Sequence, residues 1–97
     1  MIKHIVCWRV DDPSQCQKYC DGAAELLQQM RQEIEGLLHL ELAVDQSRSD
    51  TSSDLVLYSE FSSWEALSYY DQHPLHQQFK DYLGPYRTER RAADYEV

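Results

Sequence analysis

The chain has 97 residues, with nine Lys and Arg against seventeen Asp and Glu, which gives a net charge of −8. This length predicts one domain, residues 1–97. Because the negative charge repels nucleic-acid backbones and anionic lipid headgroups, we expect no nucleic acid and no membrane surface among its partners. No apolar run approaches the ~20 residues of a membrane-spanning helix. Three cysteines in such a chain are more typical of reduced thiols than of a disulfide framework. We therefore expect a cytoplasmic protein.

The first third of the chain predicts a strand followed by a long helix. Residues 2–10 alternate with period two, as in a strand. Asp12 is a candidate N-cap, and Pro13 after it suits the first position of a helix. Gln15, three residues after Asp12, resembles the second residue of a capping box. Gly36 is typical of the residue that ends a helix. One face of the strand carries Ile2, His4, Val6, Trp8 and Val10. The apolar stripe of the helix is Cys16, Tyr19, Cys20, Ala23, Leu27, Met30 and Ile34.

The middle of the chain predicts two further strands. The segment between them, residues 45–54, is rich in Ser and Asp and lacks periodicity, so we expect an exposed and mobile hairpin loop. The alternating apolar positions are Leu38, Leu40, Leu42 and Val44 in one strand, and Leu55, Leu57 and Phe61 in the other.

The last third predicts a broken helix and a final strand. Ser62 with Glu65 forms a capping box, and the helix that follows carries Trp64, Leu67 and Tyr70 on its apolar face. Pro74 interrupts this helix. A second segment then carries Leu75, Phe79 and Leu83 and ends at Gly84, and residues 88–97 can form a fourth strand.

This order of elements is that of an α+β, ferredoxin-like β-α-β-β-α-β subunit with an antiparallel four-stranded sheet. The two helices of such a subunit cover only one face of the sheet. The other face carries Ile5, Cys7, Val56 and Tyr58, and an uncovered sheet face usually shows a cleaner polar alternation. We therefore expect a homodimer in which two sheets stack face to face.

Five segments along nearly the whole chain form a recognisable signature. They are the opening Met-Ile-Lys-His-Ile-Val, Ser53–Leu57, Glu60–Ser63, Tyr70 with His73-Pro74-Leu75-His76, and Arg91–Tyr95. Together they resemble the stress-responsive α/β-barrel domain (Dabb, or dimeric α/β-barrel) family. The resemblance implies a ferredoxin-like subunit paired through its sheet to form a dimeric α/β barrel. It implies no particular activity, because most members have no assigned reaction.

A plant branch of that family implies a catalytic set. There the matching positions, which are His4, Tyr70 and His76 in this sequence, serve a polyketide-cyclising aldol reaction. Chemically, a histidine can accept a proton near neutral pH while a tyrosine donates a hydrogen bond to a carbonyl or enolate oxygen. The alternative is that the three side chains hydrogen-bond one another to satisfy buried polar atoms. The polar Gln15, Gln17 and Gln28 of the first helix point to a different substrate.

The residues around this set have both structural and functional interpretations. His73 precedes Pro74, so we expect it to close one helix or cap the next, although it can also contact a ligand. The candidate ligand-binding residues also include Trp8, Tyr19 and Leu27. These side chains are large, so the alternative is that they fill the space between the helices and the sheet and leave no cavity.

Three other patterns have a functional interpretation that we do not favour. The His73/His76 pair has metal-ligand spacing but no evident third ligand, so we expect no metal. Cys16 and Cys20 lie one turn apart within an apolar stripe, which favours small buried hydrophobes over a redox pair. Arg87, Arg90 and Arg91 could bind a carboxylate or phosphate, but we expect them to pair with neighbouring Asp and Glu.

Two functions therefore remain open from the sequence. The first is a non-catalytic dimeric protein that binds a small apolar ligand or a partner, or acts as a stress or structural protein. The second is a small enzyme with no cofactor, a cyclase, lyase or monooxygenase that uses a His/Tyr acid–base pair. A continuous cavity that reaches His76 would favour the enzyme.

Overall fold

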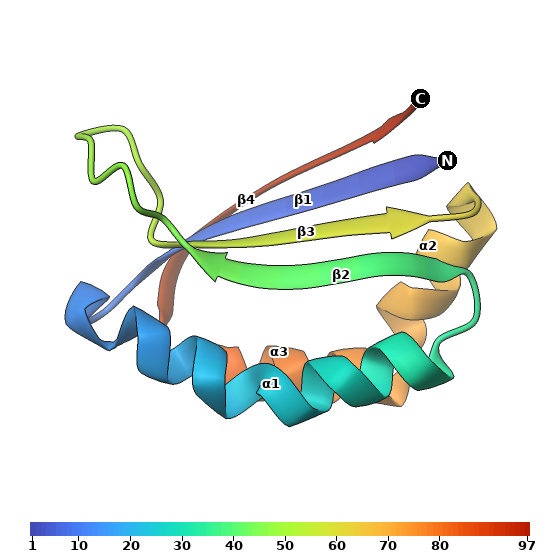
Figure 1. Cartoon of the computed structure of the whole chain (residues 1–97), viewed down its shortest axis with the longest axis horizontal. Helices are drawn as coiled ribbons and strands as arrows, with labels where there is room; N and C mark the ends of the chain where they lie inside the picture. The colour runs from blue at the N-terminus through green and yellow to red at the C-terminus, as the bar shows by residue number, and fades with distance from the viewer.

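A four-stranded antiparallel sheet forms one layer of the molecule and the helices form the other (Figure 1). The structure is a computed structural model and describes residues 1–97. The strands lie in the order β2-β3-β1-β4, which confirms the ferredoxin-like α+β fold. The elements are β1 (Ile2–Val10), a 3-10 turn η1 (Pro13–Gln15), α1 (Cys16–Glu33), β2 (Leu37–Val44), β3 (Leu55–Phe61), α2 (Trp64–Gln72), α3 (Pro74–Leu83) and β4 (Arg87–Glu96). None of the helices is both long enough and apolar enough to cross a membrane.

The two central strands supply the sheet side of the core. β1 and β3 pair antiparallel along their length, and their inward side chains alternate with partly exposed ones as predicted. Ile2, Leu55 and Phe61 are fully buried. The helix side of the core comes largely from α1, whose buried residues Cys16, Tyr19, Ala23, Leu27 and Met30 follow the predicted stripe.

The start of the first helical region differs from the prediction. Asp12 is a cap, since its carboxylate accepts a hydrogen bond from the backbone N–H of Ser14 at 3.1 Å, but it caps the turn η1 and α1 begins only at Cys16. Gln15 makes no capping hydrogen bond. Gly36 follows α1 with φ of 85°, and a Cβ there would lie 2.5 Å from the Cβ of Ala66 in α2. Glycine is therefore required both by the backbone and by the close approach of α2.

Two local predictions were wrong. Leu38 is 58% exposed because the β2–β3 register shifts between Leu37 and His39, which places Leu37 opposite Phe61. The cap of α2 is Ser63 rather than Ser62, since the Ser63 hydroxyl accepts from the backbone N–H of Ala66. Trp64 is therefore the first residue of α2 and stays exposed instead of joining the apolar face.

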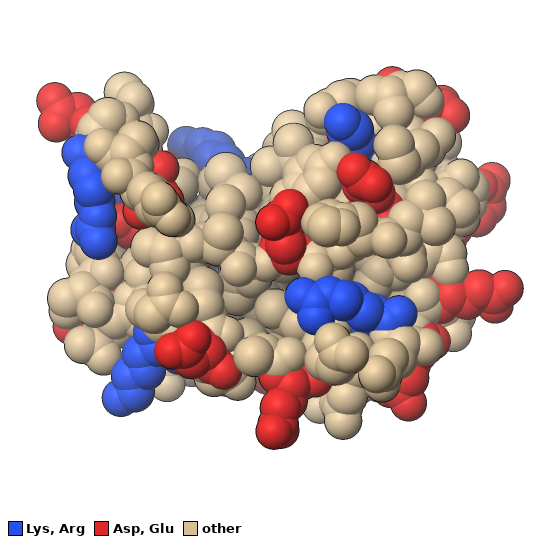
Figure 2. Space-filling model, in the orientation of Figure 1, with Lys and Arg blue, Asp and Glu red and all other residues tan.

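The loop of residues 45–54 lies on the opposite side of the sheet from the helices (Figure 1). Most of its residues are exposed, as predicted, and its side chains bond one another, as in the contact between the Ser47 and Ser52 hydroxyls at 2.7 Å. In the space-filling view the loop stands away from the rest of the molecule and leaves a hollow over the outer face of the sheet (Figure 2). Whether this loop is mobile stays a prediction.

The edge strand β4 has no helix over it. It pairs only with β1, and all of its residues are exposed. Its inward-facing side chains therefore border a groove between the edge of the sheet and α3, and the candidate site lies in this groove.

Candidate functional site

A cavity of about 320 Å³ lies between the inner face of β1 and α3 and extends to β4. Its volume is at the lower end of the range typical of small-molecule sites. An apolar wall and a polar side line it. The apolar wall is Val6, Trp8, Leu57, Phe79 and Leu83, and the polar side is His4, Asp71, His76, Lys80, Arg87 and Arg90.

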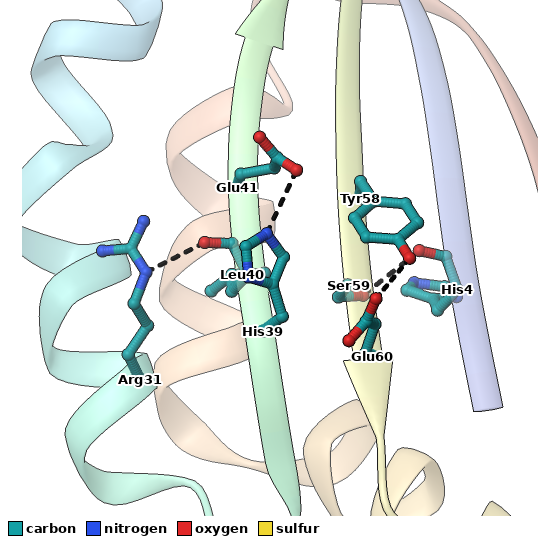
Figure 3. A network of polar contacts seen from close by, with 8 residues as sticks. All are labelled: His4, Arg31, His39, Leu40, Glu41, Tyr58, Ser59 and Glu60. Carbon is teal, nitrogen blue, oxygen red and sulfur yellow. Dashed lines mark hydrogen bonds and ion pairs between the residues drawn. The ribbon is translucent and has the colours of Figure 1, made fainter. Parts of the chain in front are cut away.

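His4 enters the cavity from β1 and is held by β4. It is 6% exposed, and its Nδ1 is hydrogen-bonded to Oδ1 of Asp94, its cross-strand partner. A carboxylate accepts here, so Nδ1 carries a proton, and Nε2 makes no hydrogen bond within the protein. The backbone carbonyl of His4 also accepts a hydrogen bond from the Ser59 hydroxyl at 3.2 Å (Figure 3). Strand pairing thus fixes both the position and the tautomer of this imidazole.

His76 enters from α3 and owes its position to the helix break before it. His73 ends α2 and caps α3, because its Nδ1 accepts a hydrogen bond from the backbone N–H of Leu75, and Pro74 opens the new helix. One turn later, Nδ1 of His76 lies 3.1 Å from the backbone carbonyl of Asp71. That carbonyl accepts the Nδ1 proton, which leaves Nε2 as the acceptor. Burial lowers the pKa of His76, with the hydrogen bond to Asp71 opposing it, so the neutral ring is favoured.

Tyr70 lies behind the two histidines on α2. Its ring centroid is 4.3 Å from that of His76 and 6.0 Å from that of His4. The side chain is fully buried, and its hydroxyl has no hydrogen-bond partner. Burial raises the pKa of the phenol well above its ordinary value, so it stays protonated at neutral pH. A buried hydroxyl without a partner is costly by about 1–3 kcal/mol, which makes a functional explanation worth seeking.

The structure thus brings together the three predicted catalytic side chains, His4, Tyr70 and His76. Their rings pack against one another, but they do not hydrogen-bond one another as the structural alternative required. Instead, His4 is hydrogen-bonded to the carboxylate of Asp94 and His76 to the backbone carbonyl of Asp71, and the hydroxyl of Tyr70 makes no hydrogen bond.

Only one of the four predicted ligand-binding residues lines the cavity. Trp8 lines the cavity, but Tyr19, Leu27 and His73 do not. Tyr19 and Leu27 are buried core residues of α1, and Tyr19 stacks on Tyr86 and donates to Asp11. His73 uses its ring as a cap.

Sequence reasoning missed Asp94 as the partner of His4, and it misjudged two arginines. Asp94 is revealed only by the β1–β4 register, which pairs the two residues. We expected Arg87 and Arg90 to pair with acidic residues, but neither lies in any of the ion pairs, and both line the cavity together with Lys80. Of the three arginines only Arg91 has an acidic partner, Glu89 at 3.4 Å.

The structure places no three His, Cys, Asp or Glu side chains close enough to hold a metal ion. Cys16 is buried and Cys20 partly buried, and both are free thiols. Burial raises the pKa of Cys20 to about 11, so its thiol stays protonated, in keeping with a packing role.

The outer face of the sheet is a second surface of note. Tyr58 donates to Glu60 at 2.5 Å, and His39 contacts Glu41 at 3.1 Å beside it (Figure 3). Ile5, Cys7 and Val56 are the partly exposed apolar residues of the same face.

The fold and the cavity place this chain in the class of small α+β proteins that have a ferredoxin-like sheet, one layer of helices and a cavity between the two layers. The sequence profile described as the stress responsive A/B barrel domain (Dabb) matches residues 2–97, and this chain belongs to that family. Among curated proteins none matches this sequence.

Several solved structures are similar to it in fold. A dimeric ferredoxin-like protein of unknown function from Bacteroides fragilis superposes with a TM-score of 0.85 at 23% identity, over 99% of this chain and 95% of that one. A Dabb family protein from Mesorhizobium loti gives 0.79 at 23%, over 99% and 95%. A structure from Caulobacter crescentus, described as a putative antibiotic biosynthesis monooxygenase, gives 0.79 at 15%, over 99% and 88%.

Proposed function

We propose that this protein is a homodimeric enzyme without a cofactor that removes a proton next to a carbonyl group in a small, partly apolar substrate. The observation that carries the proposal is the cavity, which reaches both His4 and His76 beside an apolar wall of Trp8 and Phe79. A core filled at this position would have favoured a non-catalytic protein.

In this proposal His76 is the general base. Its Nε2 is the acceptor nitrogen, and burial keeps the ring neutral at pH 7 because it lowers the pKa. The base takes the proton from the carbon next to the substrate carbonyl, and the electron pair moves onto the carbonyl oxygen as an enolate. General base catalysis of this kind contributes about 10²–10⁴-fold.

Tyr70 is the group that would stabilise the enolate. Its hydroxyl has a proton to donate and no acceptor in the folded protein. Tyr70 does not itself line the cavity, so in this proposal a substrate oxygen reaches its hydroxyl only when the rings of His4 and His76 move apart. The hydrogen bond then forms where charge develops, which is the arrangement that lowers a reaction barrier. The proton taken up by Nε2 of His76 is then returned to the substrate by His76 itself, and His4, held by Asp94, is a second imidazole beside it that can accept a hydrogen bond.

The experiment is deuterium exchange at the carbon next to a carbonyl. Phenylacetone, an uncharged aromatic ketone, is incubated with the protein in deuterated buffer, and exchange is followed by NMR. We expect exchange faster than in buffer alone, a loss of about a hundredfold or more in His76→Ala, and partial rescue of that variant by added imidazole. The control is Gln29→Ala, an exposed position on α1. No acceleration by the folded wild-type protein would favour a binding protein over an enzyme.

A monooxygenase is the second candidate, because solved proteins of this fold carry that description. Both reactions would begin with the same proton removal, so the exchange assay does not separate them. Consumption of dissolved oxygen together with substrate would favour the monooxygenase, and exchange without oxygen consumption would favour a cyclase or lyase.

The homodimer is also part of this proposal. The outer face has an apolar centre of Ile5, Cys7 and Val56 with charged residues around it, which is the usual anatomy of an interface. The similar proteins from Bacteroides fragilis and Thermobifida fusca are described as dimeric. Stacking through the outer faces would leave the cavity open, because the cavity lies on the helix side of the sheet.

A further inference from the structure

Three cationic side chains, Lys80, Arg87 and Arg90, border the candidate site on a chain whose net charge is −8. Asp71 is the only acidic residue that lines the cavity with them. None of the three cations takes part in an ion pair or donates a side-chain hydrogen bond within the protein. The cavity therefore has an excess of positive charge that the fold itself does not neutralise.

The backbone of the sheet creates this arrangement. Residues 87 and 90 are three apart, so in a regular strand their side chains would point to opposite faces. The β1–β4 register shifts at this point: Glu89 pairs with Arg9, but Arg87 pairs with Val10, which leaves Thr88 as the extra residue of a bulge. Such a bulge re-aims side chains. Both arginines consequently line the cavity on the inner side, and Lys80 joins them from α3.

The two arginines pair with β1 away from His4, whereas Lys80 follows His76 by one turn of α3. Along β1 the partner of Asp94 is His4, and the partner of Arg90 is Trp8. These two β1 residues are four apart, which corresponds to about 13 Å along a strand. Val6 and Trp8 form an apolar stretch between the two ends. The site thus has the two histidines at one end of its β1 wall and the arginines paired toward the other, although Lys80 and Arg90 are still near enough to influence the pKa of His76 and of Tyr70 respectively.

We propose that the site takes a small monocarboxylate, with its carboxylate bound by Arg87 and Arg90 and its carbonyl-bearing carbon at His76, joined by an apolar spacer against Trp8. Guanidinium groups bind carboxylates through paired, charge-assisted hydrogen bonds. A dianionic phosphate fits less well, because Asp71 lines the same cavity and would repel the second charge. This inference rests on the proposed function for the reacting end, but the anion preference itself can be measured without any reaction.

The test compares two unreactive probes, 3-phenylpropionate and its uncharged amide, by calorimetric titration of the dimeric protein. We expect the carboxylate to bind about tenfold or more tightly than the amide, with a preference that shrinks as salt is added. The double variant Arg87→Gln/Arg90→Gln should lose the preference and bind both probes alike. The double variant Lys18→Gln/Arg48→Gln is the matched control, because it removes the same net charge at exposed positions away from the cavity. It should keep the preference.

Three results would overturn the inference: equal binding of the two probes, equal losses in the two double variants, or no binding of either probe at millimolar concentration. Tighter binding of phenyl phosphate than of 3-phenylpropionate would replace the carboxylate with a phosphate. The outcome is independent of the exchange assay, which uses an uncharged ketone. If the protein catalyses deuterium exchange but does not prefer the carboxylate probe, only this inference is wrong. If it prefers the carboxylate probe but does not catalyse exchange, only the proposed reaction is wrong.

Discussion

His4 and Asp94 are direct cross-strand partners at the edge of the sheet, and Nδ1–H of His4 donates a hydrogen bond to the carboxylate of Asp94. The imidazole is almost fully buried, whereas the carboxylate side chain is 37% exposed. Asp94 does not line the cavity, so it can hold the proton of His4 on Nδ1 without touching a substrate. We assign it the role of a positioning residue.

Asp94→Ala should lower the exchange rate about tenfold or more, because His4 loses the contact that holds its proton on Nδ1. The decisive measurement is the nitrogen chemical shifts of the His4 ring, which should change from a single Nδ1–H tautomer to a mixture. Glu96→Gln is the control, since Glu96 is on the same inner side of β4, opposite Ile2, and makes no side-chain bond. An unchanged His4 tautomer in Asp94→Ala would remove this role from Asp94.

Tyr70→Phe separates function from stability. The variant removes a buried hydroxyl that has no partner, so the free energy of unfolding should stay the same or rise by about 1 kcal/mol. The exchange rate should fall, because the enolate oxygen loses its donor. Denaturant unfolding at fixed protein concentration measures the first effect and the NMR assay the second. A clear loss of stability would mean that the hydroxyl has a partner in the folded protein.

The free energy of unfolding should depend on pH through the protonation of His76. Burial lowers its pKa in the folded state below the ordinary value of about 6.5. The unfolded chain therefore binds the proton more readily, so stability is highest above pH ~6.5 and is lost as pH falls towards the folded-state pKa. His76→Gln should show a smaller loss of unfolding free energy between about pH 7.5 and 5. Parallel curves for wild type and variant would contradict a lowered pKa.

The sequence predicted the order of elements along the chain and the main strand and helix positions, because hydrophobic periodicity is long and regular in β1, β3 and α1. The grouping of His4, Tyr70 and His76 was implied by the resemblance to a plant branch of the family. The sequence could not place Arg87 and Arg90 on one face, because their orientation depends on a bulge that exists only when β4 pairs with β1. Asp94 escaped notice likewise, since its partner lies 90 residues away and only the register joins them.

Ile5→Glu should dissociate the proposed dimer. Ile5 is the outward-facing residue of the central strand β1, opposite Tyr58 of β3 and Ala93 of β4. A carboxylate there would be buried without a partner when two sheets stack, which costs several kcal/mol. Analytical ultracentrifugation at micromolar concentration should give about twice the chain mass of 11.4 kDa for wild type and the chain mass itself for the variant. Gln29→Glu, which adds the same charge on the exposed face of α1, should leave the dimer intact. A wild-type protein that sediments as a single chain would exclude the sheet-to-sheet homodimer.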